Sequence, residues 1–315
     1  MGAVGRSGAA RCFGLALALM AMSPAADAQE LEPRAYRTLP VGVNFALLSF
    51  GYSSGNVLTD PTSPIQDLDL NLRTTTLAYM RSFGLFGRSS SLQANFTYAY
   101  LSGGASLGDE TVRDSRTGDA DARIRLTVNL LGGPALSASQ FRTYRQRRNV
   151  GVSLTVVAPT GQYYPSRLIN FGSNRWSFKP ELGYSSIKGH WILEGAIGVW
   201  LFTNNTNYFG GSVRRQDPIG SAQAHVSYNF KPGLWFGLDG NFYTGGETSV
   251  DGSPGRDLQR TSRVGATVSI PLRPRHSLKF SVQSGAYTRI GADFDTATLS
   301  YLYQWGGSGR HRNPS

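Results

Sequence analysis

Apolar and polar residues alternate with a period of two along most of the chain. Between residues 121 and 130 every even position is apolar and every odd position is charged or polar. A strand sorts such residues onto two faces, whereas a helix would scatter them around its circumference. Similar alternation recurs near residues 92–100, 175–184, 221–230 and 263–270. The pattern predicts an all-β protein.

About twelve segments carry this pattern, each roughly ten residues long, which is the length that crosses a membrane at a tilt. Alternation is weaker in the first, second and seventh of them. A soluble β-sandwich, with one buried and one wet face per strand, is the alternative. The segments lie near residues 41–51, 70–82, 90–101, 120–131, 149–158, 174–186, 191–202, 219–230, 234–245, 261–271, 277–288 and 294–305.

The connections between these segments alternate between long and short, which favours a membrane barrel over the sandwich. Transmembrane barrels have short periplasmic turns and long outer loops. We therefore predict a transmembrane antiparallel up-and-down β-barrel of about 12 strands over residues 41–305; its last outer connection, 289–293, is short and departs from the trend. The long connections are 52–69, 102–119, 159–172, 203–218 and 246–260, and the short ones are 83–89, 188–190, 231–233 and 273–276.

One inner connection, residues 132–149, is long and is predicted to hold one short periplasmic helix. Ser137 and Gln140 fit a capping box, and Leu136 and Phe141 fit a hydrophobic staple. The basic residues near its end would complement the helix dipole. A plain loop is the alternative. These basic residues are Arg145, Arg147 and Arg148.

The first 28 residues are predicted to be a cleaved signal peptide. Arg6 and Arg11 precede a short apolar run, and Ala26-Asp27-Ala28 fits a cleavage site. Cys12, the single cysteine, would leave with this peptide, so the mature chain would have no disulfide. Residues 29–40 would form a periplasmic N-terminal segment and residues 306–315 a polar tail.

Composition supports an exported membrane barrel. Charged residues are 16%, against roughly 25% in a soluble domain, and the formal net charge is +11. Export disfavours nucleic acid as the partner of this charge; an anionic lipid surface or anionic solutes fit better. The connections predicted to be periplasmic carry only basic charges, which fits anionic headgroups, anionic solutes or a solvated rim. These residues are Arg88, Arg142, Arg145, Arg147, Arg148, Lys188, Lys231, Arg273 and Arg275.

Aromatic residues on the predicted lipid face fall near the ends of the strands, as in an aromatic girdle. Outer-membrane lipids, including lipopolysaccharide, are the expected surroundings. The last strand, 297–305, resembles the aromatic-ended strand that barrel-assembly machinery reads, although a polar tail follows it. The inner girdle is predicted to hold Trp191, Tyr228, Phe230, Tyr301, Tyr303 and Trp305, and the outer one Tyr100, Trp176 and Phe178.

Motifs that carry catalysis are missing from the sequence. There is no phosphate-binding loop, nucleophile elbow or zinc-binding H-E-x-x-H, and the four histidines lack ligand spacing. His225 and Ser227 share a strand face, but residues two apart lie about 7 Å from each other, too far for a catalytic hydrogen bond. We expect no catalytic residue, no metal and no cofactor. An outer-membrane esterase or phospholipase is the weakest alternative.

Charged residues that alternation directs inward are the candidate lumen lining, because Arg or Lys on the lipid face costs roughly 2–4 kcal/mol near the midplane. They would select solutes or form a salt-bridged filling. Four inward apolar residues, Ile192, Trp200, Trp235 and Tyr243, would suit aromatic solutes or pack beneath a plug. The charged candidates are Arg123, Arg125, Lys179, Glu181, Glu194, His225, Asp239, Arg263 and Lys279.

Several stretches resemble the meta-pathway phenol-degradation family of outer-membrane proteins, often called transporters. The resemblance covers nearly the whole mature chain. It implies a channel-like barrel in the outer membrane of a Gram-negative cell, with uptake of aromatic or other hydrophobic compounds. The matching stretches are Glu30–Tyr36, Pro40–Phe45, Leu168–Gly183, Gln216–Pro218, Pro232–Trp235, Ser262–Gly265 and Arg275–Lys279.

These observations give the hypothesis of a channel for passive uptake of small aromatic or hydrophobic compounds. The N-terminal residues 30–39 are too short for a folded plug but long enough to enter the lumen as a partial gate. A closed structural or adhesive barrel that acts through its outer loops is the alternative. The candidate gate residues are Glu30, Glu32, Arg34 and Tyr36.

Overall fold

The computed structural model describes residues 33–58, 65–107, 110–167 and 170–307. The predicted signal peptide, Glu30, Glu32 and most of the predicted tail lie outside the described residues. The barrel strands are β1 (Val43–Leu58), β2 (Ile65–Leu85), β3 (Arg88–Leu107), β4 (Glu110–Asp119), β5 (Ala122–Leu131), β6 (Arg148–Ala158), β7 (Ser177–Lys188), β8 (Trp191–Phe202), β11 (Ile219–Lys231), β12 (Leu234–Gly245), β15 (Gln259–Arg273), β16 (His276–Thr288) and β17 (Gly291–Gly306).

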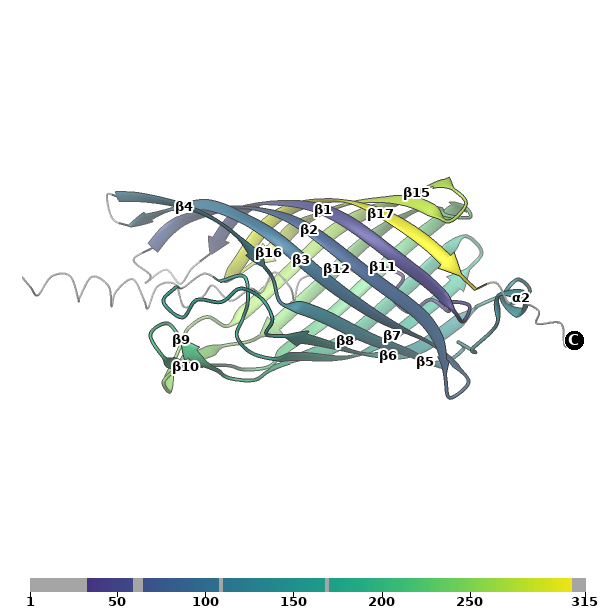
Figure 1. Cartoon of the computed structure of the whole chain (residues 1–315), viewed down its shortest axis with the longest axis horizontal. Coiled ribbons are helices and arrows are strands. Elements are labelled where there is room, and N and C mark those ends of the chain that lie inside the picture. The colour runs from purple at the N-terminus through teal and green to yellow at the C-terminus, as the bar shows by residue number, and fades with distance from the viewer. Residues whose placement is uncertain (1–32, 59–64, 108–109, 168–169, 308–315) are drawn as a thin grey trace, which may run out of the picture.

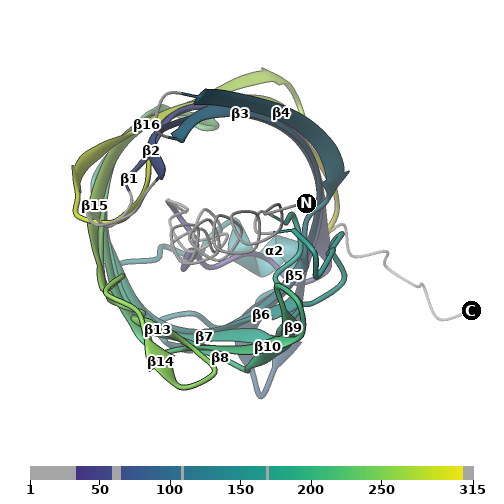
Figure 2. The ribbon, with the colours of Figure 1, turned by 90° about the vertical axis from the view of Figure 1, so that its left-hand side faces the viewer.

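These strands close into one antiparallel barrel (Figures 1 and 2). Each strand pairs with its neighbours in sequence, and β1 pairs with both β2 and β17, which joins the two ends of the sheet. β4 pairs with residues 98–107 of β3 and β5 with residues 90–95, so β4 and β5 together form one stave of the wall. The barrel therefore has twelve staves, and the predicted fold class is confirmed.

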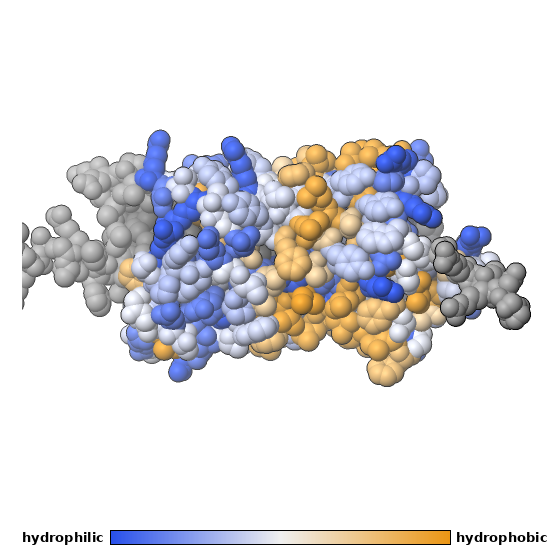
Figure 3. Space-filling view, in the orientation of Figure 1, coloured by the Kyte–Doolittle hydropathy of each residue, from blue (hydrophilic) through white to orange (hydrophobic). Residues whose placement is uncertain are grey.

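Period-two alternation explains which side chains fill the barrel. On β7, Lys179 and Glu181 are buried, while Leu182 between Glu181 and the next inward residue is 47% exposed. Exposed apolar side chains on the outside form a hydrophobic surface over the part of the barrel nearer the short turns, and the opposite part is hydrophilic (Figure 3). A surface that is apolar on the outside matches the lipid band of a membrane barrel.

The two ends of the barrel differ as the connection lengths predict. Tight turns, both chain ends of the barrel and a short helix lie at one end, and the longer connections lie at the other (Figure 1). Three inner-girdle residues gather beside two of the tight turns: Trp191 and Phe230 each pack on the Tyr228 ring, with centroids 4.9 and 5.1 Å away. No helix among the described residues is long and apolar enough to span a membrane.

Two predicted outer loops prove to be mostly strand. Residues 52–58 and 65–69 extend β1 and β2, and residues 102–107 and 110–119 form a β3–β4 hairpin. The prediction of loops there was wrong because it assumed that strands end with the membrane-crossing pattern. Cross-strand backbone hydrogen bonds continue outside the membrane wherever two chain segments stay adjacent.

Two further outer connections contain a second, four-stranded sheet that the sequence pattern missed. It consists of β9 (Asn205–Tyr208), β10 (Ser212–Gln216), β13 (Thr248–Val250) and β14 (Ser253–Pro254). Asp257 holds the second of these connections in place, since its carboxylate accepts hydrogen bonds from the backbone N–H (2.8 Å) and hydroxyl (2.7 Å) of Thr248. These strands are three to five residues or shorter, too short to show alternation.

The long inner connection contains the predicted helix, shortened to one turn, α2 (Ala138–Phe141). The capping box is present: Gln140 N–H donates to Ser137 Oγ at 3.3 Å, and Ser137 N–H donates to Gln140 Oε1 at 2.9 Å. The expected dipole contacts were wrong, because the helix ends before Arg145, Arg147 and Arg148 are reached, and Arg148 already begins β6.

Candidate functional site

The nine predicted lumen charges face the inside of the barrel. Lys179, Glu181, Glu194, His225, Asp239 and Arg263 are each at most 8% exposed. Arg123, Arg125 and Lys279 are half-buried, while their strand neighbours of opposite parity, such as Ile124 and Phe280, are exposed to the outside. Their orientation follows from alternation. Their role in selecting solutes stays a prediction.

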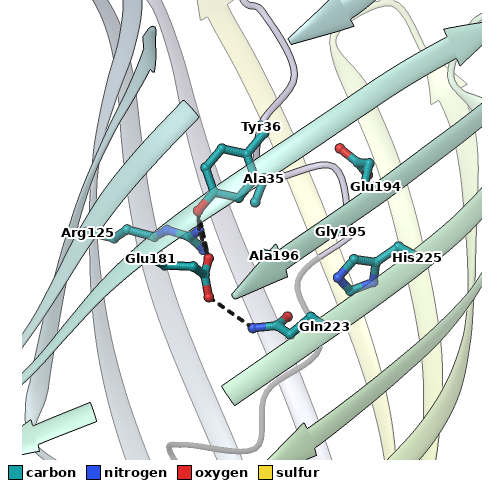
Figure 4. A pocket seen from close by; sticks show the side chains of 9 residues that line it. All are labelled: Ala35, Tyr36, Arg125, Glu181, Glu194, Gly195, Ala196, Gln223 and His225. Atoms are coloured by element: carbon teal, nitrogen blue, oxygen red, sulfur yellow. Dashed lines mark hydrogen bonds and ion pairs between the residues drawn. The ribbon is translucent and has the colours of Figure 1, made fainter. Parts of the chain in front are cut away.

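Glu181 is the centre of a buried network in the lumen (Figure 4). Its carboxylate pairs with Arg125 at 2.9 Å and with Lys179 at 2.5 Å. It also accepts hydrogen bonds from the Tyr36 hydroxyl at 2.8 Å and from the Gln223 amide at 3.2 Å. Contacts across strands β5, β7 and β11 therefore meet at one carboxylate, as in the salt-bridged filling.

A second buried pair joins β11 to β12. Nδ1 of His225 lies 2.7 Å from Oδ1 of Asp239, and the Thr267 hydroxyl donates to Oδ2 of Asp239 at 3.1 Å. Ser227, the serine of the esterase alternative, accepts instead from the Arg34 guanidinium at 3.2 Å. The two residues that an esterase would couple therefore have other partners.

The N-terminal segment, residues 33–42, enters the lumen and contacts several strands (Figure 2). The Arg34 backbone N–H donates to Glu194 at 2.7 Å, and its guanidinium donates to Asn229 at 2.9 Å. That guanidinium also lies 3.8 Å above the ring of Trp235. Burial and the charge of Arg37 lower the pKa of Arg34 to about 9, so Arg34 still carries its charge at neutral pH.

Tyr36 anchors this segment and is only 3% exposed. Its ring lies against Gly183 of β7, where an added Cβ would overlap the ring, and against Gly151 of β6, where a Cβ would come within 2.7 Å. Asn149 donates to the Tyr36 carbonyl at 2.6 Å. Burial, together with the charge of Glu181, raises the pKa of the Tyr36 hydroxyl, which therefore stays protonated and donates to Glu181.

The space left between the segment and the wall is narrow. The pocket there is lined by Ala35, Tyr36, Arg125, Glu181, Glu194, Gly195, Ala196, Gln223 and His225 (Figure 4) and admits little more than a water molecule. Of the four candidate gate residues, Arg34 and Tyr36 therefore lie in the lumen, where the sequence analysis expected a gate. Glycines at inward strand positions were the sequence signal for the slot that holds Tyr36, and it was not used.

An apolar cluster lies elsewhere inside the barrel. Val157, Trp200, Ile219 and Tyr243 are at most 5% exposed and pack together, with Phe202 against them. Trp200 and Tyr243 were predicted to point inward by alternation, as were Ile192 and Trp235, which are also buried. Within the part of the chain that the structure describes, no group of three metal-ligating side chains is close enough to hold a metal ion.

A closed antiparallel barrel with an apolar outer band and a charged, polar interior defines an outer-membrane β-barrel of the channel architecture. Residues 49–300 match the family described as "Putative MetA-pathway of phenol degradation", and the chain belongs to that family. This confirms the resemblance found in the sequence, and the fold places the protein in the outer membrane.

Solved structures share this fold. The crystal structure of the COG4313 outer membrane channel from Pseudomonas putida F1 superposes with a TM-score of 0.72 at 20% identity, covering 88% of this chain and 100% of that one. The transport unit of the autotransporter AIDA-I from Escherichia coli has a TM-score of 0.49 at 11% identity, covering 92% and 98% of the two chains. No curated protein matches the sequence.

Replacing Gly183 with alanine is expected to loosen the N-terminal segment. The new methyl group would occupy the volume of the Tyr36 ring, and overpacking of this kind costs about 1–3 kcal/mol. Tyr36 would leave its slot, and the open probability in single-channel recordings would rise severalfold. Gly195→Ala is the matched control on the next strand, since its nearest neighbour would be 3.6 Å away. Equal open probabilities for the two variants would contradict the role of the slot.

Proposed function

We propose that the protein is a passive outer-membrane channel for small aromatic or hydrophobic compounds. The observation that carries the proposal is the apolar cluster of Val157, Trp200, Ile219 and Tyr243 inside a barrel whose lumen is otherwise polar. Large rings that face inward offer a solute the stacking contacts that aromatic groups make with each other, worth about 0.5–1.5 kcal/mol beyond the area buried. The family description, which refers to phenol degradation, supports the same class of solute.

In this proposal the solute diffuses down its gradient from the outer loops towards the N-terminal segment. That segment is the gate, held closed by Tyr36 and Arg34. Its anchors are hydrogen bonds and a cation–π contact rather than covalent links, so thermal motion can release them. A segment that leaves the lumen would open the narrow pocket beside Glu181.

The protein's surroundings and its lack of catalysis belong to the same proposal. The exposed apolar staves would contact outer-membrane lipids, with lipopolysaccharide on the outer side, and the aromatic-ended β17 would be read by the barrel-assembly machinery. We assign no enzymatic activity, and the partners found for Ser227 and His225 support that assignment. The basic residues near the tight turns would lie against anionic headgroups of the inner leaflet.

Planar bilayers and liposomes test the function directly. The mature protein, refolded into detergent, is expected to give stepwise conductance and to admit phenol, benzoate or a fatty acid into liposomes faster than empty liposomes do. A folded barrel that passes neither ions nor any of the three solutes would overturn the proposal and favour a structural or adhesive barrel. In that case, deletion of outer-loop residues 246–258 would abolish binding without affecting assembly.

A further inference from the structure

Cationic groups and aromatic rings lie next to each other on the inner wall formed by β7 and β8. Cζ of Arg175, just before β7, lies 4.3 Å from the ring centre of Phe202, and Nζ of Lys179 lies 5.8 Å from that of Trp200. The Trp200 and Phe202 rings are nearly parallel, at 8°, with centroids 6.5 Å apart. The apolar cluster therefore has positive charge along one edge.

Two hydrogen-bond donors on this wall lack an acceptor within the described residues. Nη1 of Arg175 and Nε1 of Trp200 are both buried without a partner there, in side chains of residues only 6% and 4% exposed. Buried donors are almost always satisfied in proteins, and leaving one unpaired is costly. An acceptor that comes from outside this part of the chain would satisfy them.

The surroundings of Arg175 favour an acceptor with negative charge. Burial and the nearby charge of Arg214 on β10 lower the pKa of Arg175 to about 9, so it remains a cation at neutral pH. The nearest carboxylate, that of Asp121, already accepts hydrogen bonds from the Gly161 N–H and from the N–H and hydroxyl of Ser173. Two guanidinium groups thus face a region with little negative charge available to them.

We infer that Arg175, Trp200, Phe202 and Tyr243, called here the outer aromatic site, bind the anion of an aromatic carboxylic acid. The ring of the solute would stack on Phe202 and Trp200, and its carboxylate would accept from Arg175, since guanidinium and carboxylate form strong charge-assisted pairs. This inference rests on the proposed function and names one solute class for it.

The outer aromatic site is covered in the closed form by the hairpin that contains β10. Gln216 on that hairpin accepts a hydrogen bond from the Arg175 guanidinium. An entering carboxylate would replace this neutral amide oxygen with a charged acceptor, which makes a hydrogen bond about twice as strong. The exchange gives the site a preference for anions over neutral rings of the same size.

Equilibrium dialysis of benzoate against the detergent-folded mature protein tests the inference. Saturable binding is expected, with benzyl alcohol and acetate both weaker competitors than benzoate. Arg175→Gln should weaken benzoate binding about tenfold or more, and Arg175→Lys should weaken it less. Arg215→Gln is the matched control, because Arg215 lies next to Arg214 on β10 but is exposed.

Two outcomes would overturn the inference: equal benzoate affinities for Arg175→Gln and Arg215→Gln, or acetate competing as well as benzoate. The heat-dependent gel mobility of each variant verifies that the barrel has folded. Phenol uptake into liposomes separates this inference from the proposed function. Uptake of phenol without Arg175-dependent benzoate binding would reject the outer aromatic site alone, and benzoate binding without uptake of any solute would reject the channel alone.

Discussion

Deletion of residues 30–39 is expected to raise the single-channel conductance of the barrel severalfold. The described part of this segment lies across the lumen, and its Tyr36 is held by Glu181, by Asn149 and by the glycine slot on β6 and β7. Without it, the narrow pocket beside Glu181 would join the rest of the lumen. Recordings in planar bilayers at fixed salt and voltage would measure the change.

A point variant separates the anchor from the segment as a whole. Tyr36→Ala empties the glycine slot and removes the hydroxyl that donates to Glu181, so the open probability should rise while the open-state conductance stays close to that of the deletion. Tyr164→Ala, in an exposed outer connection, should behave as the unmodified protein does. A deletion variant with unchanged current would show that the segment does not limit flow.

The wall of the barrel follows from local sequence because inward and outward positions alternate at every residue. Arg125 and Glu181 could therefore both be assigned to the lumen before any contact was known. Their ion pair could not, because they are 56 positions apart and meet only once β5, β6 and β7 lie side by side. Periodicity fixes the face of a residue, while the register of three strands fixes its partner.

The N-terminal segment shows a different limit. Its short length and position suggested a partial gate, yet the slot that holds Tyr36 depends on Gly151 and Gly183, and a missing side chain leaves no mark in a hydropathy pattern. Arg175 also faces inward by alternation, but its unpaired Nη1 depends on the hairpin that contains β10. That hairpin is made of strands too short to have a period.

Replacing Glu181 with alanine is expected to lower the free energy of unfolding by about 3–5 kcal/mol, the range for removing one partner of a buried ion pair. Arg125 and Lys179 would lose their shared carboxylate, and Tyr36 and Gln223 would lose an acceptor. Denaturant unfolding in detergent micelles, followed by tryptophan fluorescence, measures the loss. Asp114→Asn is the control, because the Asp114–Arg116 pair is exposed, and such pairs contribute about 0–1 kcal/mol.

The same variant decides between the two readings of the lumen charges. If Glu181 is part of a filling, Lys179→Met combined with Glu181→Met should recover much of the lost stability, since a buried cation no longer lacks its partner. If Glu181 instead lines a wet, selective path, the alanine variant should unfold at the same denaturant concentration as the unmodified protein while its anion selectivity rises. Water screens a pair in an open path, so stability and selectivity would move separately, and measuring both on one variant distinguishes a structural carboxylate from a selective one.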